Sequence, residues 1–242
     1  AHNNITLTDN PTLEDGAIYS IAFDATDAAG NAATTITNTG VTYDVTAPTI
    51  SSTAPAQDAS IKDTKVSYTL SEAVASGTVT FTRTGGSLDG SSPHEQDLSG
   101  DELNTGAHNN ITLTDNPTLE DGAIYSIAFD ATDAAGNAAT RVTNTGITYD
   151  VTAPTMVITA AEGADGLTSN DATLALTFTS SEATANFAEG DISVDNGALS
   201  DFVVTSTTVY TATFTPTADG AATIDVAGST FTDAAGNNNT AA

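Results

Sequence analysis

The sequence predicts an all-β protein in which small sandwich domains follow one another along the chain. One observation is that short segments of alternating apolar and polar residues are separated by frequent turn formers, with almost no helical periodicity. The other is a long internal repeat, because residues 1–50 match residues 107–156 at an offset of 106. A repeat of this length has the size of a whole domain. The two copies differ only at Thr35/Arg141, Ile36/Val142, Val41/Ile147 and Ile50/Met156.

The segment from residue 130 to residue 155 provides the landmarks that divide the chain. It reads DATDAAGNAATRVTNTGITYDVTAPT and contains an acidic turn, a strand and an Asp-x-Thr-Ala-Pro-Thr junction. A near-copy occupies residues 24–49, and the turn returns as FTDAAGN, ending at Asn237. These landmarks predict the C-terminal part of a domain over residues 1–46, a complete domain over 47–151, and a divergent domain over 152–242 that lacks its last strand. We therefore expect the chain to be a segment of a longer repetitive protein.

The strands of the two larger domains follow from alternation with a period of two residues. In the last strand of the middle domain, Val142 differs in parity from Ile147 and Tyr149, so we predict a β-bulge at Gly146. The alternating apolar sets in the middle domain are Val66, Tyr68 and Leu70; Val79 and Phe81; and Tyr125, Ile127, Phe129 and Ala131. In the last domain they are Met156 and Ile158; Leu174, Leu176 and Phe178; Ile192 and Val194; Tyr210, Ala212 and Phe214; and Ile224 and Val226.

Three local motifs lie between these strands. Residues 84–96, TGGSLDGSSPHEQ, are rich in turn formers and predict a loop. Ser99 and Glu102 have the spacing of a capping box, which predicts a single helical turn before Leu103. Tyr125 follows a tight turn that Asp121-Gly122 is suited to form, and this arrangement resembles the tyrosine corner of immunoglobulin-type sandwiches.

The charge balance restricts the classes of partner. The chain has 31 Asp and Glu residues against 4 Lys and Arg, for a formal net charge of −27. We expect no nucleic-acid binding, because residues that neutralise phosphates are scarce. We expect no direct membrane insertion of this segment, because no run approaches the ~20 apolar residues of a membrane span. The chain has no Cys, so its domains must be stabilised by their cores or by metal ions.

The motifs SEAV, DGAIY, DATDAAGN and DVTAPT are similar to those of bacterial immunoglobulin-like repeats in giant surface adhesins. The secreted RTX and biofilm-associated adhesins are the nearest parallels. FAEGDISVDNGALSDF and FTDAAGN in the last domain resemble a second subtype of the same superfamily, so the resemblance covers the whole chain. It implies tandem Ig-like β-sandwich domains in a beads-on-a-string array, an extracellular extender region, and calcium often bound at the domain junctions.

The Ig-like topology gathers acidic side chains at each junction. The turn before the last strand and the turn after the second strand both lie beside the incoming linker. Ca²⁺ prefers several carboxylate and carbonyl oxygens on flexible loops, so we predict Ca²⁺ at both junctions. The alternative is that Asp and Asn only form turns by hydrogen-bonding to their own backbone. The candidate ligands are Asp44, Glu72, Asp133 and Asn137 for the middle domain, Asp150, Glu182, Asp233 and Asn237 for the last domain, and, in second rank, Asp24 and Asp130.

Other chemistry has little support in the sequence. His2, His94 and His108 lack metal-ligand spacing and are predicted to be surface residues. No motif of nucleophilic, zinc or phosphate chemistry is present, and carboxylate pairs are too abundant for any one to indicate a glycosidase. We predict that the chain is not an enzyme.

The predicted function is that of a structural extender in a secreted cell-surface adhesin or extracellular fibre, made rigid by calcium at its linkers. The predicted location is the bacterial cell surface. The expected partners are neighbouring repeats of the same long chain or other copies in a fibre. Two alternatives stay open: a carbohydrate- or protein-binding adhesion module, and a subunit of a strand-complemented filament. The absence of Trp counts against a sugar-binding platform.

Overall fold

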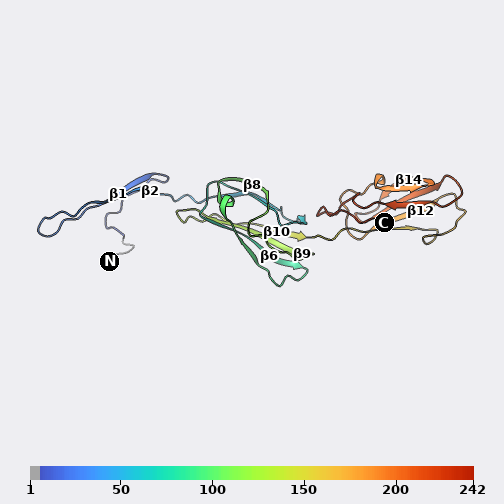
Figure 1. The fold of residues 1–242 in the computed structure, drawn as a ribbon, viewed down its shortest axis with the longest axis horizontal. Helices are drawn as coiled ribbons and strands as arrows, with labels where there is room; N and C mark the ends of the chain where they lie inside the picture. Colours follow the sequence, from blue (N-terminus) through green and yellow to red (C-terminus); the bar gives the residue numbers. More distant parts are fainter. Residues whose placement is uncertain (1–5) are drawn as a thin grey trace.

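Three β-rich parts lie in a row along the chain in the computed structural model, which describes residues 6–242 (Figure 1). The first part is an antiparallel hairpin of β1 (Ile18–Phe23) and β2 (Ile36–Thr42). The second and third parts are β-sandwiches, and each has an apolar core of its own. The predicted fold class, an all-β array of tandem sandwiches, is confirmed.

The middle sandwich consists of a five-stranded sheet and a three-stranded sheet. The larger sheet has the strand order β4-β10-β9-β6-β7 and is antiparallel except between β4 and β10. Its strands are β4 (Ser60–Ile61), β6 (Ser76–Gly86), β7 (His94–Asp97), β9 (Ala123–Thr132) and β10 (Val142–Tyr149). The smaller sheet has the order β3-β5-β8 and contains β3 (Ile50–Ala54), β5 (Val66–Leu70) and β8 (Gly106–Ile111).

The predicted alternation places the core of this sandwich correctly. Tyr125, Ile127, Phe129 and Ala131 on β9 are at most 4% exposed. The apolar side chains of β5 in the opposite sheet are at most 2% exposed and belong to the same cluster. Because successive side chains of a strand point to opposite faces, each strand contributes its alternate residues to the core.

Two predicted irregularities are confirmed. The register of β10 against β9 shifts between Asn144 and Ile147, and Gly146 in this bulge has a φ of 74°. A single turn of 3-10 helix, η1 (Gly100–Leu103), follows Ser99. The carboxylate of Glu102 accepts a hydrogen bond from the Ser99 backbone N–H at 2.8 Å, as a capping box requires.

The prediction of a loop over residues 84–96 is wrong at both ends. β6 continues to Gly86 because its backbone pairs with β9 as far as Ala123, so the ladder satisfies these peptide groups despite the turn-forming side chains. β7 begins at His94, which pairs with Phe81 of β6. The His94 side chain is only 11% exposed, so the prediction that it is a surface residue is also wrong. His108 is half-buried and stacks on Tyr68 with the ring centroids 4.6 Å apart, while His2 lies outside the described residues.

The last sandwich combines a four-stranded sheet with a two-stranded sheet. The larger sheet has the order β11-β12-β15-β14, with β11 (Met156–Ala160), β12 (Leu174–Ser180), β14 (Gly197–Val204) and β15 (Val209–Pro216). The smaller sheet pairs β13 (Ile192–Asp195) with β16 (Thr223–Val226), and a 3-10 turn, η2 (Glu189–Asp191), precedes β13. Phe187 stands at the centre of the core, edge-on to Tyr210 and Phe231. Within residues 6–242 no strand follows Asn237. The C-terminal residue Ala242 nevertheless forms two backbone hydrogen bonds with Val226 of β16.

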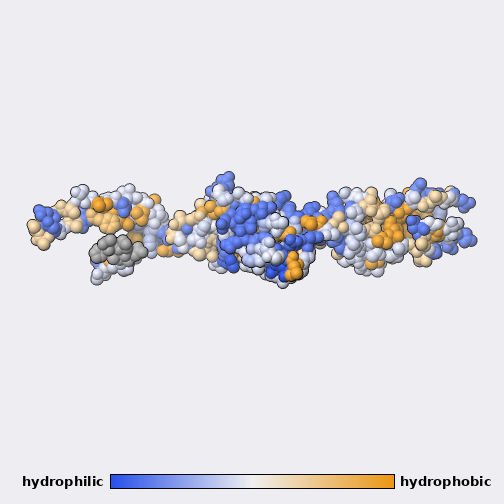
Figure 2. Space-filling model, turned by 60° about the horizontal axis from the view of Figure 1, so that its bottom comes forward, coloured by the Kyte–Doolittle hydropathy of each residue, from blue (hydrophilic) through white to orange (hydrophobic). Residues whose placement is uncertain are grey.

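The N-terminal hairpin exposes the face that its repeat buries in the middle sandwich. Ile21 is 42% exposed and Phe23 58%, whereas their equivalents in β9, Ile127 and Phe129, are 0% and 2% exposed. The space-filling view shows apolar surface over this part of the chain (Figure 2). In the middle sandwich β9 and β10 are covered by the sheet that contains β5, and within residues 6–242 the hairpin pairs with no such sheet.

Candidate metal site at each domain junction

Each sandwich carries three acidic side chains at the end where its linker enters. In the middle sandwich Asp44 lies in the linker, Glu72 follows β5 and Asp133 follows β9. The last sandwich repeats this plan with Asp150 in the linker, Glu182 after β12 and Asp233 after β16. Sandwich topology therefore unites three stretches that are far apart in the sequence.

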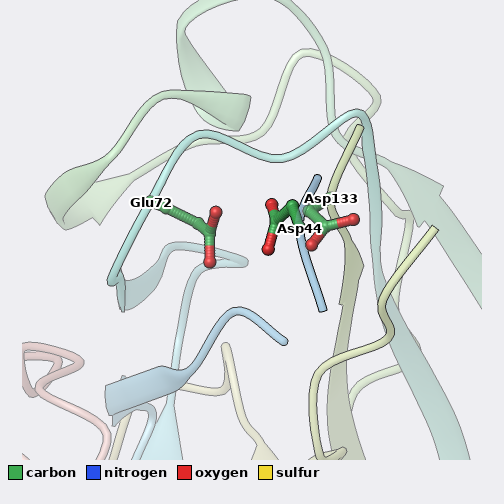
Figure 3. A group of neighbouring side chains, drawn as sticks. All are labelled: Asp44, Glu72 and Asp133. Atoms are coloured by element: carbon green, nitrogen blue, oxygen red, sulfur yellow. The ribbon is translucent and has the colours of Figure 1, made fainter. Parts of the chain in front are cut away.

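The three carboxylates of each junction converge. One oxygen from each of Asp44, Glu72 and Asp133 lies within 4.8 Å of the other two, and Figure 3 shows the Glu72 carboxylate facing Asp44, with Asp133 beside Asp44. The same holds for Asp150, Glu182 and Asp233. Asp133 and Asp233 are buried, at 3% and 2% exposure, while the four other residues are half-buried.

Local hydrogen bonds hold the aspartate of each acidic turn. Asp133 accepts hydrogen bonds from the backbone N–H groups of Ala135 (2.9 Å) and Asn137 (2.8 Å) and from the Asn137 side-chain amide (2.8 Å). Burial alone would raise the pKa of Asp133, but these hydrogen bonds outweigh it, so the pKa lies below its usual value. Asp233 accepts the equivalent bonds from the backbone and side chain of Asn237 at 2.8 and 2.9 Å.

Asp27 in the first repeat shows that the acidic turn can form where no other carboxylates converge. Its carboxylate accepts the same bonds from Ala29 and Asn31, at 2.8–2.9 Å, on the exposed surface. Within residues 6–242, Asp27 belongs to no group of converging acidic residues. The turn therefore forms without neighbouring carboxylates, and its own geometry does not require the approach of a linker aspartate or of Glu72.

The two asparagines predicted as ligands connect the turn to the linker. The Asn137 side-chain N–H donates to the Asp44 carbonyl at 3.2 Å, and that of Asn237 donates to the Asp150 carbonyl at 2.9 Å. Each asparagine thus uses its nitrogen to hold the linker backbone beside the carboxylates.

The acidic groups have little compensating charge in this structure. Across residues 6–242 none of the six carboxylates forms an ion pair. Burial raises the pKa of Glu182, and the nearby negative charges of Asp150 and Asp233 raise it further. The second-rank candidates do not join these groups, because Asp130 pairs with Arg141 at 2.6 Å and Asp24 bonds to the Thr35 hydroxyl.

Sequence reasoning missed a second carboxylate that holds each linker. Asp121 accepts hydrogen bonds from the Val151 N–H at 2.8 Å and the Thr152 hydroxyl at 2.6 Å. The bond from the Thr152 hydroxyl, and to a smaller extent the bond from the Val151 N–H, lower the pKa of Asp121. Asp15 binds Val45 and Thr46 in the same way at the preceding junction. The signal in the sequence is the Asp-Gly pair that precedes both Tyr19 and Tyr125, which indicates a tight turn and also supplies a carboxylate near the linker.

The predicted tyrosine corner is confirmed and extended. The Tyr125 hydroxyl accepts a hydrogen bond from the Glu120 N–H at 3.1 Å and donates to the Asp89 carboxylate at 2.7 Å. The same Asp89 oxygen lies 2.7 Å from His94 Nε2. Burial would raise the pKa of Asp89, but the bonds from His94, Tyr125 and Ser91 lower it to about 2. Burial raises the pKa of Tyr125 to about 12.

Comparison with protein families gives two adjacent matches. One family model, described as a bacterial Ig-like domain, matches residues 44–149, and a different model with the same description matches residues 150–242. No curated protein matches the chain. Bacterial Ig-like domains are typically non-catalytic structural modules. Between residues 6 and 242 no helix is long and apolar enough to cross a bilayer. From residue 44 to residue 242, the chain therefore belongs to the bacterial Ig-like family, as two domains in tandem.

Proposed function

We propose that this chain is an extender segment of a secreted bacterial surface adhesin or extracellular fibre, and that Ca²⁺ at the linkers holds successive domains in line. The observation that carries the proposal is the repetition of one arrangement at two junctions. Domains that match different family models place a linker Asp, a Glu and a buried turn Asp within 4.8 Å of one another. The partners that this role requires are neighbouring domains of the same polypeptide.

The chemistry of the two groups suits a hard divalent cation. Three carboxylates on loops, with carbonyl oxygens nearby, provide the ligand type that Ca²⁺ prefers. Asp44 would bind from the linker, while Glu72 and Asp133 would bind from the domain that follows. A bound ion would thus neutralise mutual repulsion and connect the linker to two loops at once. Sites of this extracellular kind bind with dissociation constants of roughly 10⁻⁴–10⁻³ M.

The linkers are already restricted in conformation, which would limit the entropy lost on binding. Pro48 and Pro154 are buried, and each proline fixes its own φ and keeps the preceding residue extended. Asp15 and Asp121 hold the next part of each linker from the preceding domain. Metal binding would therefore complete an ordered junction.

The experiment is small-angle X-ray scattering of the chain with Ca²⁺ and with a chelator, together with calorimetric titration. We expect a longer and better-defined maximum dimension with Ca²⁺, and a higher melting temperature because the ion binds only the folded form. Asp150→Ala combined with Glu72→Gln should abolish both effects. Asp27→Asn is the matched control, since it alters the same turn where no carboxylates converge. Identical shape and melting temperature with Ca²⁺ and with chelator would contradict the proposal.

A further inference from the structure

Lys62 makes a direct contact between the middle and last domains. It follows β4, which runs parallel to β10 and ends beside the linker, where the Asp150 N–H donates to the Ile61 carbonyl at 2.8 Å. From this position the Lys62 ammonium donates a hydrogen bond to the Gly236 carbonyl. Gly236 belongs to the acidic turn of the last domain, between Asp233 and Asn237.

The burial of the two acidic turns provides a second observation. Ala235 and Gly236 are half-buried, whereas Ala135 and Gly136, at the same positions of the turn in the middle domain, are exposed. The bonds from Asn137 to Asp133 and from Asn237 to Asp233 are alike, and the two turns differ only in the bond from the Ala135 N–H, which has no counterpart at Ala235. The difference in burial agrees with the approach of Lys62, because a Cβ added at Gly236 would lie 3.5 Å from the ammonium nitrogen.

Lys62 differs from the other basic residues in contacting a different domain. Of the other basic residues, Lys65 pairs with Asp63 at 3.6 Å, Arg141 pairs with Asp130, and Arg83 donates to carbonyl groups of its own loop. Lys62 instead reaches a turn that carries the buried carboxylate of Asp233. The negative charge of the converging Asp150, Glu182 and Asp233 favours an ammonium group there.

We propose that Lys62 is an interdomain latch that restricts the orientation of the last domain against the middle domain before a metal ion binds, and that Ca²⁺ adds to this restriction when it binds. The linker is held from both sides, by Asp121 of the middle domain at Val151 and Thr152 and by Asn237 of the last domain at the Asp150 carbonyl. Lys62 supplies a second connection beside the linker, and two separate connections restrict both bending and rotation. The Lys62 side chain is exposed, so salt weakens the latch.

The test measures interdomain order in the presence of a chelator. The chain has no native Cys, so Leu88→Cys and Val204→Cys place one spin label on each domain at sites that are 84% and 61% exposed. We expect the distribution of label-to-label distances to be about twofold broader in Lys62→Gln than in the parent chain, because domains in one chain move freely unless a contact holds them. High salt should broaden the parent distribution and leave that of Lys62→Gln unchanged.

Lys65→Gln is the matched control, because it removes an equal charge that pairs only within the middle domain. Its distance distribution should equal that of the parent chain, and the melting of each domain should be the same in all variants. The latch is refuted if Lys62→Gln leaves the distribution unchanged or if Lys65→Gln broadens it equally. Because the measurement excludes Ca²⁺, its result is independent of the calcium proposal.

Discussion

Tyr125 connects a turn, a strand and a hairpin loop through one hydroxyl group. It accepts from the Glu120 backbone, and it donates to Asp89, which also binds His94. The Asp89 side chain is 2% exposed, so this network is closed to solvent. A buried polar network of this kind stabilises the fold only while every member keeps its partner.

Tyr125→Phe should destabilise the middle domain by about 1–3 kcal/mol, since it leaves the Glu120 N–H and one bond of Asp89 without a partner. Chemical denaturation followed by the middle-domain transition measures the effect. Tyr19→Phe is the control, because the Tyr19 hydroxyl accepts the equivalent bond from Glu14 at 2.8 Å but lies in the separate N-terminal hairpin. An unchanged midpoint for Tyr125→Phe would show that the corner does not contribute to stability.

Strand β10 depends on its bulge. Gly146 takes a φ of 74°, and the neighbouring Thr145 carbonyl accepts a hydrogen bond from the Asp58 N–H at 2.9 Å. A Cβ at Gly146 would lie 2.2 Å from the Asp58 carboxylate oxygen. The bulge therefore returns Ile147 to the core face and also brings the segment before β4 against β10.

Gly146→Ala should destabilise the middle domain by about 1–3 kcal/mol, because alanine is strained at this φ and its methyl group would displace Asp58. Thermal unfolding detects the loss. Gly90→Ala provides the comparison, since a Cβ at Gly90 meets no atom within 4 Å and should leave the melting temperature unchanged. Equal melting temperatures for both variants would refute the role of the bulge.

The elements that the sequence predicted well are those in which apolar periodicity decides the structure. The strands with Val66, Tyr125 and Phe178 alternate, so their core faces follow from the pattern alone. The loop over residues 84–96 was misjudged because backbone pairing between β6 and β9 determines where a strand ends. His94 was misjudged for a related reason, since its contact with Asp89 of the β6–β7 loop forms where that loop folds back to Tyr125 of β9, and periodicity does not specify this fold.

The candidate metal site also has features that the sequence predicts and features that it does not. The convergence of Asp44, Glu72 and Asp133 was predictable from topology, because an Ig-like sandwich places their three loops at one end. The roles of Asp121 and Lys62 were not, because each acts beyond its own sandwich, Asp121 on the linker and Lys62 on the next domain. Such contacts depend on how one domain is placed beside another, which strand periodicity does not specify.

The N-terminal hairpin and the middle domain provide two versions of one sequence. The segment 48–106 covers the apolar face of β9 and β10, while the near-identical face of β1 and β2 is exposed. The chain thus contains this apolar face twice and the segment that covers it once. If two copies of the chain exchanged the segment 48–106, each copy would still have one apolar face that no segment covers.

Adding a second copy of residues 48–106 directly before Ala1 should bury the exposed face, since it recreates the order of the middle domain. Hydrogen exchange should then slow in β1 and β2 to the rates of β9 and β10, and an additional cooperative unfolding transition should appear. The same extended chain with Phe23→Asp serves as the control and should remain unprotected, because a charge would then lie in the new core. Rapid exchange of β1 and β2 without the substitution would contradict this prediction.

The acidic turn and the linker aspartate recur at domains that match two different family models. The connection is therefore made of standard parts that do not depend on the remaining sequence of either domain. Gene duplication or recombination can insert, remove or exchange a domain while the joint that receives it stays the same. A polypeptide of this kind can change its length over evolutionary time without a new interface for each added domain.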